Sequence, residues 1–367
     1  MGADGNAPPA VQLRGVTKHF GKVIAVHEID LDIPDGSLTT LLGPSGCGKT
    51  TILRMIAGLE KPTQGDIFIK GRRVNDTPIH KRNLGMIFQN YALFPHKTIF
   101  DNVAFGLKYR NVTKADINAK VKQALETVRL PGVERRMPFQ LSGGQQQRIA
   151  LARAIVIEPD VLLMDEPLSA LDENLREEMR MEVSNLQEML GITSIFVTHD
   201  QREALTMSDS IVIMKDGRKQ QEGPPEEVYD APGSHFVADF IGHSNFFNGQ
   251  IMQLDEGQVV VELDDGFELK VTQTGDLREG QRVEVVARAQ KCHLTPREQP
   301  LSETAENQFQ GRIKDRSYMG GEVRYFVELE TGTVIHVIGG VKDMLFRRAD
   351  EVLVQVFAKD CRILVPE

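Results

Sequence analysis

The stretch Gly43-Pro-Ser-Gly-Cys-Gly-Lys-Thr50 constrains this chain more than any other, because it matches the phosphate-loop pattern G-x-x-x-x-G-K-[ST]. Leu38–Leu42, just before it, predicts a buried strand, and Thr51–Ala57 predicts the start of a helix. This context turns backbone N–H groups and a helix N-terminus toward one point, where a triphosphate would bind. The alternative is a glycine-rich turn without a ligand. A dinucleotide-binding loop is excluded, because no G-x-G-x-x-G occurs.

Each polar group of this loop has an expected task. Lys49 would reach the β and γ phosphates of ATP, and the Thr50 hydroxyl would ligate Mg²⁺. A helix N-terminus and a nearby ammonium would lower the pKa of the Cys47 thiol and make it the most reactive of the three cysteines. The alternative is that Cys47 fills a small space under the loop and is shielded. The nucleotide ligands predicted here are Gly43, Pro44, Ser45, Gly46, Cys47, Gly48, Lys49, Thr50 and Thr51.

A second buried strand, Val161–Asp165, ends in two adjacent carboxylates. Asp165 would hold Mg²⁺ through water, and Glu166 would polarise the water that attacks the γ phosphate. Successive strand residues point to opposite faces of a sheet. We therefore expect Glu166 to lie at or past the strand end, where the following Pro167 fits such an exit.

Two further predicted strands end in polar side chains. Leu84–Gln89 ends in an amide, and Thr193–Val197 leads into His199. A lone histidine at a strand end is more often structural, but His199 would be one of four polar groups that strand ends carry toward one phosphate. Near the N-terminus, Val11–Asp35 predicts paired antiparallel strands with Phe20 between them. That ring either stacks on an adenine or belongs to the core.

The segment Leu141–Gln145 precedes a predicted helix. Ser142 is a natural N-cap for that helix. Alternatively, Ser142 with the N–H groups of Gly143 and Gly144 forms a second anion site. Two anion sites would be redundant within one monomer, and they make sense if each serves a different molecule's ATP.

Length and composition restrict the classes of protein further. The 367 residues allow two domains or more, and no apolar run approaches the roughly 18 residues of a membrane helix. Residues 1–10 predict a disordered tail that is no signal peptide. Three cysteines without a C-x-x-C pair argue against a disulfide framework or a zinc site. A net charge of −9 gives no basic footprint for nucleic acid.

The C-terminal third contains an internal repeat. Asn245–Ile251 recurs as Asn307–Ile313, and Val283–Leu294 recurs as Val352–Ile363, with Cys292 matching Cys361. Such duplication predicts two similar β segments that fold together, with both cysteines in the core. Residues 240–367 carry a net charge of −6. This makes the segment a poor phosphate binder, so dimer contact or regulation is the expected role.

Together these motifs resemble the ATP-binding subunits of ABC transporters, in family order from Val11 to Phe240. The resemblance implies an α/β P-loop ATPase domain with a mixed sheet over residues 11–239, including a mostly helical insertion at about 90–158. A C-terminal all-β, OB-like domain would occupy residues 240–367. The resemblance assigns catalysis to Glu166, His199 and Lys49. It assigns ATP contacts to Phe20, Gln89, Ser142, Gly143, Gly144, Gln145 and Asp172, and Mg²⁺ to Thr50, Gln89 and Asp165.

The same resemblance implies partners and a location. Two chains would form a head-to-tail homodimer that holds two ATP molecules, each between Lys49 of one chain and Ser142 of the other. This dimer would drive two membrane permease subunits, served by an extracytoplasmic solute-binding protein, from the cytoplasmic face of the cell membrane. The apolar segment Asn90–Leu107 is core or a docking face, and the resemblance favours docking around Gln89–Phe94.

The sequence leaves alternatives for the transported solute and for the functional class of the protein. The cassette and Phe240–Phe247 look most like the polyamine (spermidine/putrescine) branch, although ferric iron, phosphonate, sulfate and sugar importers have similar subunits. A non-transport ABC ATPase acting on nucleic acid or ribosomes would usually carry tandem cassettes or a long coiled-coil insertion. A P-loop kinase would have no need for Leu141–Gln145 or His199.

Overall fold

A computed structural model describes residues 8–110, 112–255, 257–273, 275–298, 305–340 and 346–365. The chain divides into two compact units that meet between Val228 and Tyr229, called unit 1 and unit 2 below. This division lies eleven residues before the domain boundary predicted at 239/240. Within the described ranges, no helix has the length and apolar character needed to cross a membrane.

A six-stranded sheet positions the candidate site in unit 1. All neighbouring strands run parallel except β10, which pairs antiparallel with β9. The carboxyl ends of the parallel strands therefore meet at one edge, as the predicted site requires. In spatial order the strands are β10 (Arg218–Gly223), β9 (Ser210–Lys215), β3 (Leu38–Leu42), β8 (Thr193–Thr198), β7 (Val161–Asp165) and β6 (Leu84–Ile87).

A second, antiparallel sheet confirms the paired strands predicted near the N-terminus. Its order is β2 (Val23–Ile33), β1 (Val11–Phe20), β4 (Gln64–Ile69) and β5 (Arg72–Arg73). Helix α1 (Lys49–Ala57) buries apolar side chains in one cluster with residues of both sheets. The helix that follows the phosphate loop is thereby fixed on both sides.

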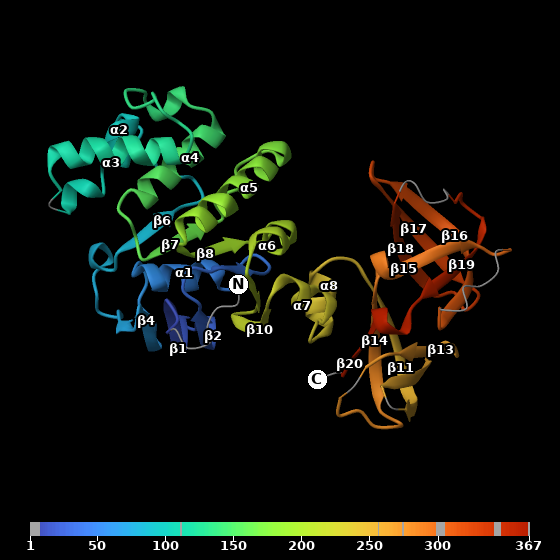
Figure 1. Ribbon diagram of the computed structural model, residues 1–367. Coiled ribbons are helices and arrows are strands. Elements are labelled where there is room, and N and C mark those ends of the chain that lie inside the picture. The colour runs from blue at the N-terminus through green and yellow to red at the C-terminus, as the bar shows by residue number, and fades with distance from the viewer. Residues whose placement is uncertain are drawn as a thin grey trace. The chain divides into compact units, whose positions relative to one another are not determined.

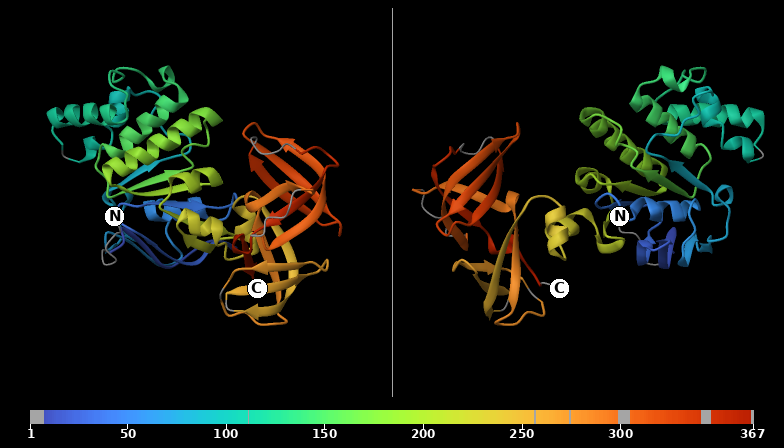
Figure 2. Two further views of the ribbon diagram at one scale, coloured as in Figure 1. Left: turned by 45° about the vertical axis from the view of Figure 1, so that its right-hand side comes forward. Right: turned by 180° about the vertical axis from the view of Figure 1, so that it is seen from behind.

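Helices form the other end of unit 1, with the parallel strands between them and the antiparallel sheet (Figures 1 and 2). The segment 90–158, predicted to be mostly helical, contains the helices Ile99–Val103, Lys114–Thr127 and Gly143–Ile155. Besides α1, the helices of the described ranges are α2 (Ile99–Val103), α3 (Lys114–Thr127), α4 (Gly143–Ile155), α5 (Glu173–Leu190), α6 (Gln201–Met207), α7 (Pro225–Asp230) and α8 (His235–Phe240). Short 3₁₀ turns are η1 (Ile79–Lys81), η2 (Leu107–Tyr109), η3 (Pro138–Gln140), η4 (Ala289–Lys291) and η5 (Ala358–Asp360).

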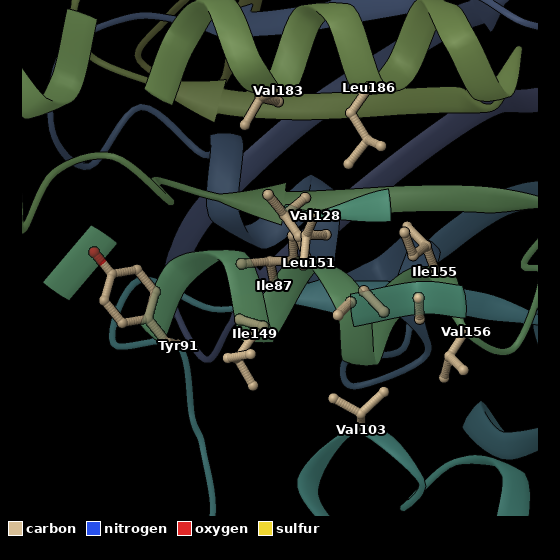
Figure 3. Packing of buried hydrophobic residues seen from close by; sticks show 14 of the residues in the cluster. Ile87, Tyr91, Val103, Val128, Ile149, Leu151, Ile155, Val156, Val183 and Leu186 are labelled. Carbon is tan, nitrogen blue, oxygen red and sulfur yellow. The ribbon is translucent and has the colours of Figure 1, made fainter. Parts of the chain in front are cut away.

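The apolar segment after β6 belongs largely to the core. Tyr91, Ile99 and Val103 are buried in one cluster with α3, α4 and α5, and Leu93 and Phe100 pack against it half-buried. Figure 3 shows members of this cluster, including Tyr91 and Val103. Of the two interpretations offered for this segment, the core one holds for these five side chains.

The described strands of unit 2 form two five-stranded antiparallel sheets. The first has the order β13 (Glu268–Val271), β12 (Gln258–Leu263), β11 (Ser244–Asp255), β14 (Arg282–Arg288) and β20 (Cys361–Leu364). The second has the order β15 (Cys292–Pro296), β19 (Glu351–Val356), β16 (Asn307–Tyr318), β17 (Glu322–Leu329) and β18 (Val334–Gly340). Each half of the repeat gives its last strand to the other sheet, because β14 leads into β15 and β19 leads into β20.

Equivalent residues of the repeat make equivalent bonds. The Asn245 amide donates to the carbonyl of His336 at 2.8 Å and accepts from its N–H at 2.7 Å. The Asn307 amide makes the same pair of bonds with Lys270, at 2.8 and 2.7 Å. Cys292 and Cys361 are 2% and 4% exposed, so the prediction of two core cysteines is confirmed.

Arg288 anchors the start of unit 2. Arg288 is only 5% exposed. Its guanidinium donates to the carbonyls of Tyr229, Ala238 and Ile241 and to the Ser244 hydroxyl. No carboxylate of the described chain pairs with it in an ion pair, and burial lowers the pKa of this guanidinium. The cation therefore depends on backbone acceptors from the segment that precedes and begins β11.

We expect Arg288→Met to destabilise unit 2 by about 3 kcal/mol, because it leaves several buried acceptors without a donor. Faster amide hydrogen exchange in β11 and β14 would show this loss. Arg282→Met is the matched control on β14, since Arg282 is largely exposed and, within the described ranges, forms its ion pair with the exposed Asp264. Equal exchange in the two variants would contradict the anchoring role.

Candidate active site

The phosphate loop joins β3 to α1 as the sequence predicts. Gly48 is the N-cap of α1 with a φ of 100°, and no side chain of the described residues caps the helix there. The first N–H groups of α1 are thus available to an anion. Pro44, Ser45 and Gly46 are exposed, whereas Lys49 is only 4% exposed. The Lys49 ammonium donates to the carbonyls of Gly43 and Pro44 at 2.6 and 2.8 Å.

Two glycines of the loop allow a matched test. A Cβ at Gly48 would lie 2.6 Å from the Ala25 carbonyl oxygen, whereas a Cβ at Gly46 would meet nothing within 4 Å. Both have positive φ, 100° and 82°. Gly46→Ala therefore adds backbone strain alone, and Gly48→Ala adds strain and a clash. We expect Gly48→Ala to weaken ATP binding by at least about tenfold more than Gly46→Ala in a fluorescent-nucleotide titration. Equal dissociation constants would show that the Ala25 contact is irrelevant.

The structure contradicts the expectation that the Cys47 thiol has a lowered pKa. Cys47 is 4% exposed, and burial raises the pKa of its thiol more than the nearby Lys49 ammonium lowers it. Its sulfur would lie 2.8 Å from a Cβ placed on Gly43. Cys47 thus fills the space under the loop, as the alternative interpretation proposed, and the helix N-terminus does not activate it.

A raised pKa leaves less thiolate at neutral pH, so alkylation of Cys47 should be slow. We expect maleimide at pH 7 to label Cys47 at least about tenfold more slowly in the folded protein than in denaturant, with the rate rising as the pH increases. Peptide mass spectrometry measures both rates. Labelling of the folded protein at the denatured rate would mean that the thiol is accessible and ionised after all.

Thr50 and Asp165 meet where β7 ends beside α1. The Thr50 hydroxyl donates to Asp165 Oδ1 at 2.8 Å. Asp165 is 7% exposed, and burial raises the pKa of its carboxyl, while the Thr50 hydrogen bond acts in the opposite direction. Two hard oxygen donors, one on a desolvated carboxylate that a cation would stabilise, suit Mg²⁺.

Glu166 leaves the strand as predicted. Its φ is 46°, its N–H donates to the Val197 carbonyl at 3.0 Å, and its carbonyl accepts from the Ser169 hydroxyl at 2.8 Å. A left-handed backbone just past β7 frees the Glu166 side chain from the pleat. Its carboxylate Oε2 lies 3.2 Å from His199 Nδ1. The structure thus brings together the ends of β7 and β8.

Gln89 lies in a turn past β6 and is exposed. The two residues of this turn that follow Asn90, Tyr91 and Ala92, both have positive φ. Arg153 of α4 donates to their carbonyls at 2.7 and 2.6 Å. No motif singled out Arg153, although an arginine on the apolar face of a predicted helix is a signal worth following. It ties the turn after Gln89 to the helix that begins after Ser142.

Ser142 caps α4 within unit 1. Its hydroxyl accepts from the Gln145 N–H at 3.4 Å, and its own N–H donates to Gln145 Oε1 at 3.1 Å. The N-cap interpretation is therefore confirmed, and since Ser142 and Gly143 are exposed, the capping does not bury them. Asp172 likewise caps α5 by accepting from the Leu175 N–H at 3.0 Å. Both residues face solvent in the single chain.

Phe20 stands at the end of β1 and is 46% exposed. The Lys18 ammonium lies 4.6 Å from the centre of its ring. An aromatic side chain with this exposure is not core, so the structure favours the interpretation of Phe20 as a surface that a base could stack on.

Comparison with known proteins decides the family. A family model described as ABC transporter matches residues 26–169, and a model described as TOBE domain matches residues 298–364. The spermidine/putrescine import ATP-binding protein PotA of Rubrobacter xylanophilus is 44% identical over 361 residues, 97% of this chain and 94% of that protein. The chain belongs to the ATP-binding subunits of ABC transporters. As an ABC-type ATPase it binds and hydrolyses ATP.

Other members of the ABC family are similar over comparable lengths. The Fe(3+) ions import ATP-binding protein FbpC 1 of Rhizobium meliloti is 44% identical over 339 residues, 92% of this chain and 93% of that protein. A solved bacterial ABC transporter cassette, dimeric in its structure, is 32% identical with a TM-score of 0.53. It covers 59% of this chain and 98% of its own. The share of this chain that the cassette covers is thus close to the length of unit 1.

Proposed function

We propose that this ABC subunit powers import of a polyamine such as spermidine or putrescine. The observation that carries the proposal is the 44% identity to a spermidine/putrescine import ATP-binding protein across 94% of that protein's length. Ferric iron is the second candidate, because a ferric iron import protein is equally identical over 93% of its length. The charge of residues 240–367, a net −6, argues against an ABC ATPase that acts on nucleic acid.

The proposed catalytic step uses the ends of three parallel strands. Lys49 exchanges its two loop carbonyls for phosphate oxygens, and the N–H groups of Gly46–Thr51 surround the phosphates. Thr50 and Asp165 would hold Mg²⁺, with Gln89 as a further ligand, and the ion would neutralise developing charge on the phosphates. Glu166 orients and polarises the attacking water, and His199, 3.2 Å from it, contacts the γ phosphate.

The proposed partner is a second copy of this chain. Ser142, Gly143, Gly144, Gln145 and Asp172 would contact ATP held by the other copy, and their exposure in the single chain supports this for Ser142, Gly143 and Asp172. The solved dimeric cassette gives the proposal further support. Phe20 would stack on the adenine of its own chain's ATP. The closed dimer must bind ATP more tightly than the open dimer does, because only a difference in affinity shifts the equilibrium between the open and closed states.

The dimer would act on two membrane permease subunits. An extracytoplasmic solute-binding protein would deliver the solute to these subunits. This chain would lie as a peripheral subunit at the cytoplasmic face of the cell membrane.

Uptake assays test the solute. A strain lacking this chain is supplied with radiolabelled spermidine, putrescine or ferric iron and complemented with the native or the Glu166→Gln gene. We expect the native gene alone to restore polyamine uptake at least about tenfold, because import requires hydrolysis. Restored iron uptake with unchanged polyamine uptake would select the second candidate.

A further inference from the structure

A group of polar side chains, most of them buried, adjoins the Glu166–His199 pair. Glu203 of α6 is 4% exposed, and burial raises the pKa of its carboxyl. Its Oε2 accepts from the Thr198 hydroxyl at 2.5 Å. The Thr198 oxygen in turn accepts from the Asp200 N–H at 3.0 Å. The bonds of one hydroxyl therefore restrain the backbone on both sides of His199.

Arg176 of α5 extends this network to the segment that carries Asp172. It donates to the Leu171 carbonyl at 2.9 Å, and its Nη1 lies 3.7 Å from the Asp200 carboxylate. Its Nε is buried without a hydrogen-bond partner in the described chain and faces Glu203 Oε1 at 4.0 Å. Arg176 thus touches both segments that flank the candidate site.

The network and the catalytic pair share one small cavity of about 40 Å³. Its lining residues are Glu166, Ser169, Arg176, Thr198, His199, Asp200 and Glu203. A buried carboxyl is costly unless it makes hydrogen bonds that the fold needs. Neither the phosphate loop nor the Mg²⁺ ligands touch Glu203 or Arg176 through the bonds described above. Their contacts instead reach the side chains of Thr198 and Asp200, which flank His199, and the carbonyl before Asp172. Arg176 also donates to the exposed Glu173 carboxylate at 3.1 Å.

We propose that Arg176, Thr198 and Glu203 are positioning residues that hold His199 beside Glu166 and tie both to the segment carrying Asp172. The proposal rests on the proposed catalytic roles of Glu166 and His199. A positioning network acts on the reacting geometry and leaves ATP binding alone. Its loss therefore lowers kcat and leaves KM for ATP unchanged, since a misplacement of about 1 Å costs up to about 10²-fold in rate.

Steady-state hydrolysis by the purified full-length chain provides the test. Glu203→Ala and Thr198→Val should each lower kcat about tenfold or more with KM for ATP within about twofold of native. Thr198→Ser and Glu203→Gln restore the hydroxyl and its acceptor, so each should recover most of the rate. Arg176→Met should resemble Glu203→Ala. Glu177→Ala is the matched control, because it makes the same chemical change as Glu203→Ala at an exposed position on α5; it should stay native.

A double-variant comparison tests whether the network acts through His199. Adding Glu203→Ala to His199→Ala should slow hydrolysis no further, whereas an unchanged tenfold loss would overturn the proposal. Native kcat in Glu203→Ala and Thr198→Val would also overturn it, as would losses that Glu203→Gln and Thr198→Ser leave unrepaired. A failure of the proposed function is distinguishable, because Glu166→Gln would then hydrolyse ATP at the native rate.

Discussion

Glu166→Gln should slow ATP hydrolysis by about 10²–10⁴ and leave ATP affinity unchanged. The amide keeps the shape of the side chain but lacks the basic oxygen that, in the proposed role, would take a proton from the attacking water. Glu166 makes no hydrogen bond to the phosphate loop among its described contacts, so ATP binding has no reason to change. The variant should accumulate as an ATP-bound dimer, because the step that reopens the dimer is lost.

The measurement combines turnover by phosphate release with mass by light scattering, each with Mg-ATP. Glu177→Gln is the matched control, since it makes the same chemical change at an exposed position on α5. It should hydrolyse ATP at the native rate and, like the native chain, should not accumulate as an ATP-bound dimer. Near-normal turnover in Glu166→Gln would rule out its role as general base.

Much of this site could be predicted because it depends on backbone order. The strands before Gly43, Glu166 and His199 are short apolar runs, and parallel strands place the residues after their carboxyl ends at one edge of the sheet. The position of Glu166 outside the pleat could be anticipated from its neighbour Asp165, since adjacent strand residues diverge. The structure shows how the Glu166 side chain leaves the pleat: the Glu166 backbone has a φ of 46° and is hydrogen-bonded to Val197 and Ser169.

The charge state of Cys47 could not be predicted in the same way. Its neighbours in sequence, a helix N-terminus and Lys49, both favour the thiolate, and the sequence contains no direct measure of burial. In the fold, Cys47 is packed beneath the loop, and desolvation outweighs these effects. Arg176 and Glu203 escaped prediction for a related reason, because their contacts span separate helices and no short motif contains them both.

The repeat in unit 2 was visible in the sequence, but the exchange of strands between its halves was not. Matching residues such as Cys292 and Cys361 establish duplication without saying which sheet each strand joins. That choice depends on the 3₁₀ turns Ala289–Lys291 and Ala358–Asp360, which carry the chain from one sheet to the other.

Variants of Lys49 and Ser142 test whether two chains share each ATP. Lys49→Ala and Ser142→Arg should each abolish hydrolysis in a homodimer, because every shared site then contains one defect. Ser142→Arg places a bulky cation at the exposed N-cap of α4, which the other chain's ATP would contact. A heterodimer of the two variants concentrates both defects in one site and leaves the other site native.

The test is to purify that heterodimer through two different affinity tags and to measure its ATPase rate. We expect the heterodimer to hydrolyse ATP at up to about half the native rate when the two sites act independently. We also expect one retained ATP per heterodimer when both chains carry Glu166→Gln, whereas neither parent should retain any. A heterodimer as inactive as its parents, and with no retained ATP, would contradict the claim that each ATP lies between Lys49 of one chain and Ser142 of the other.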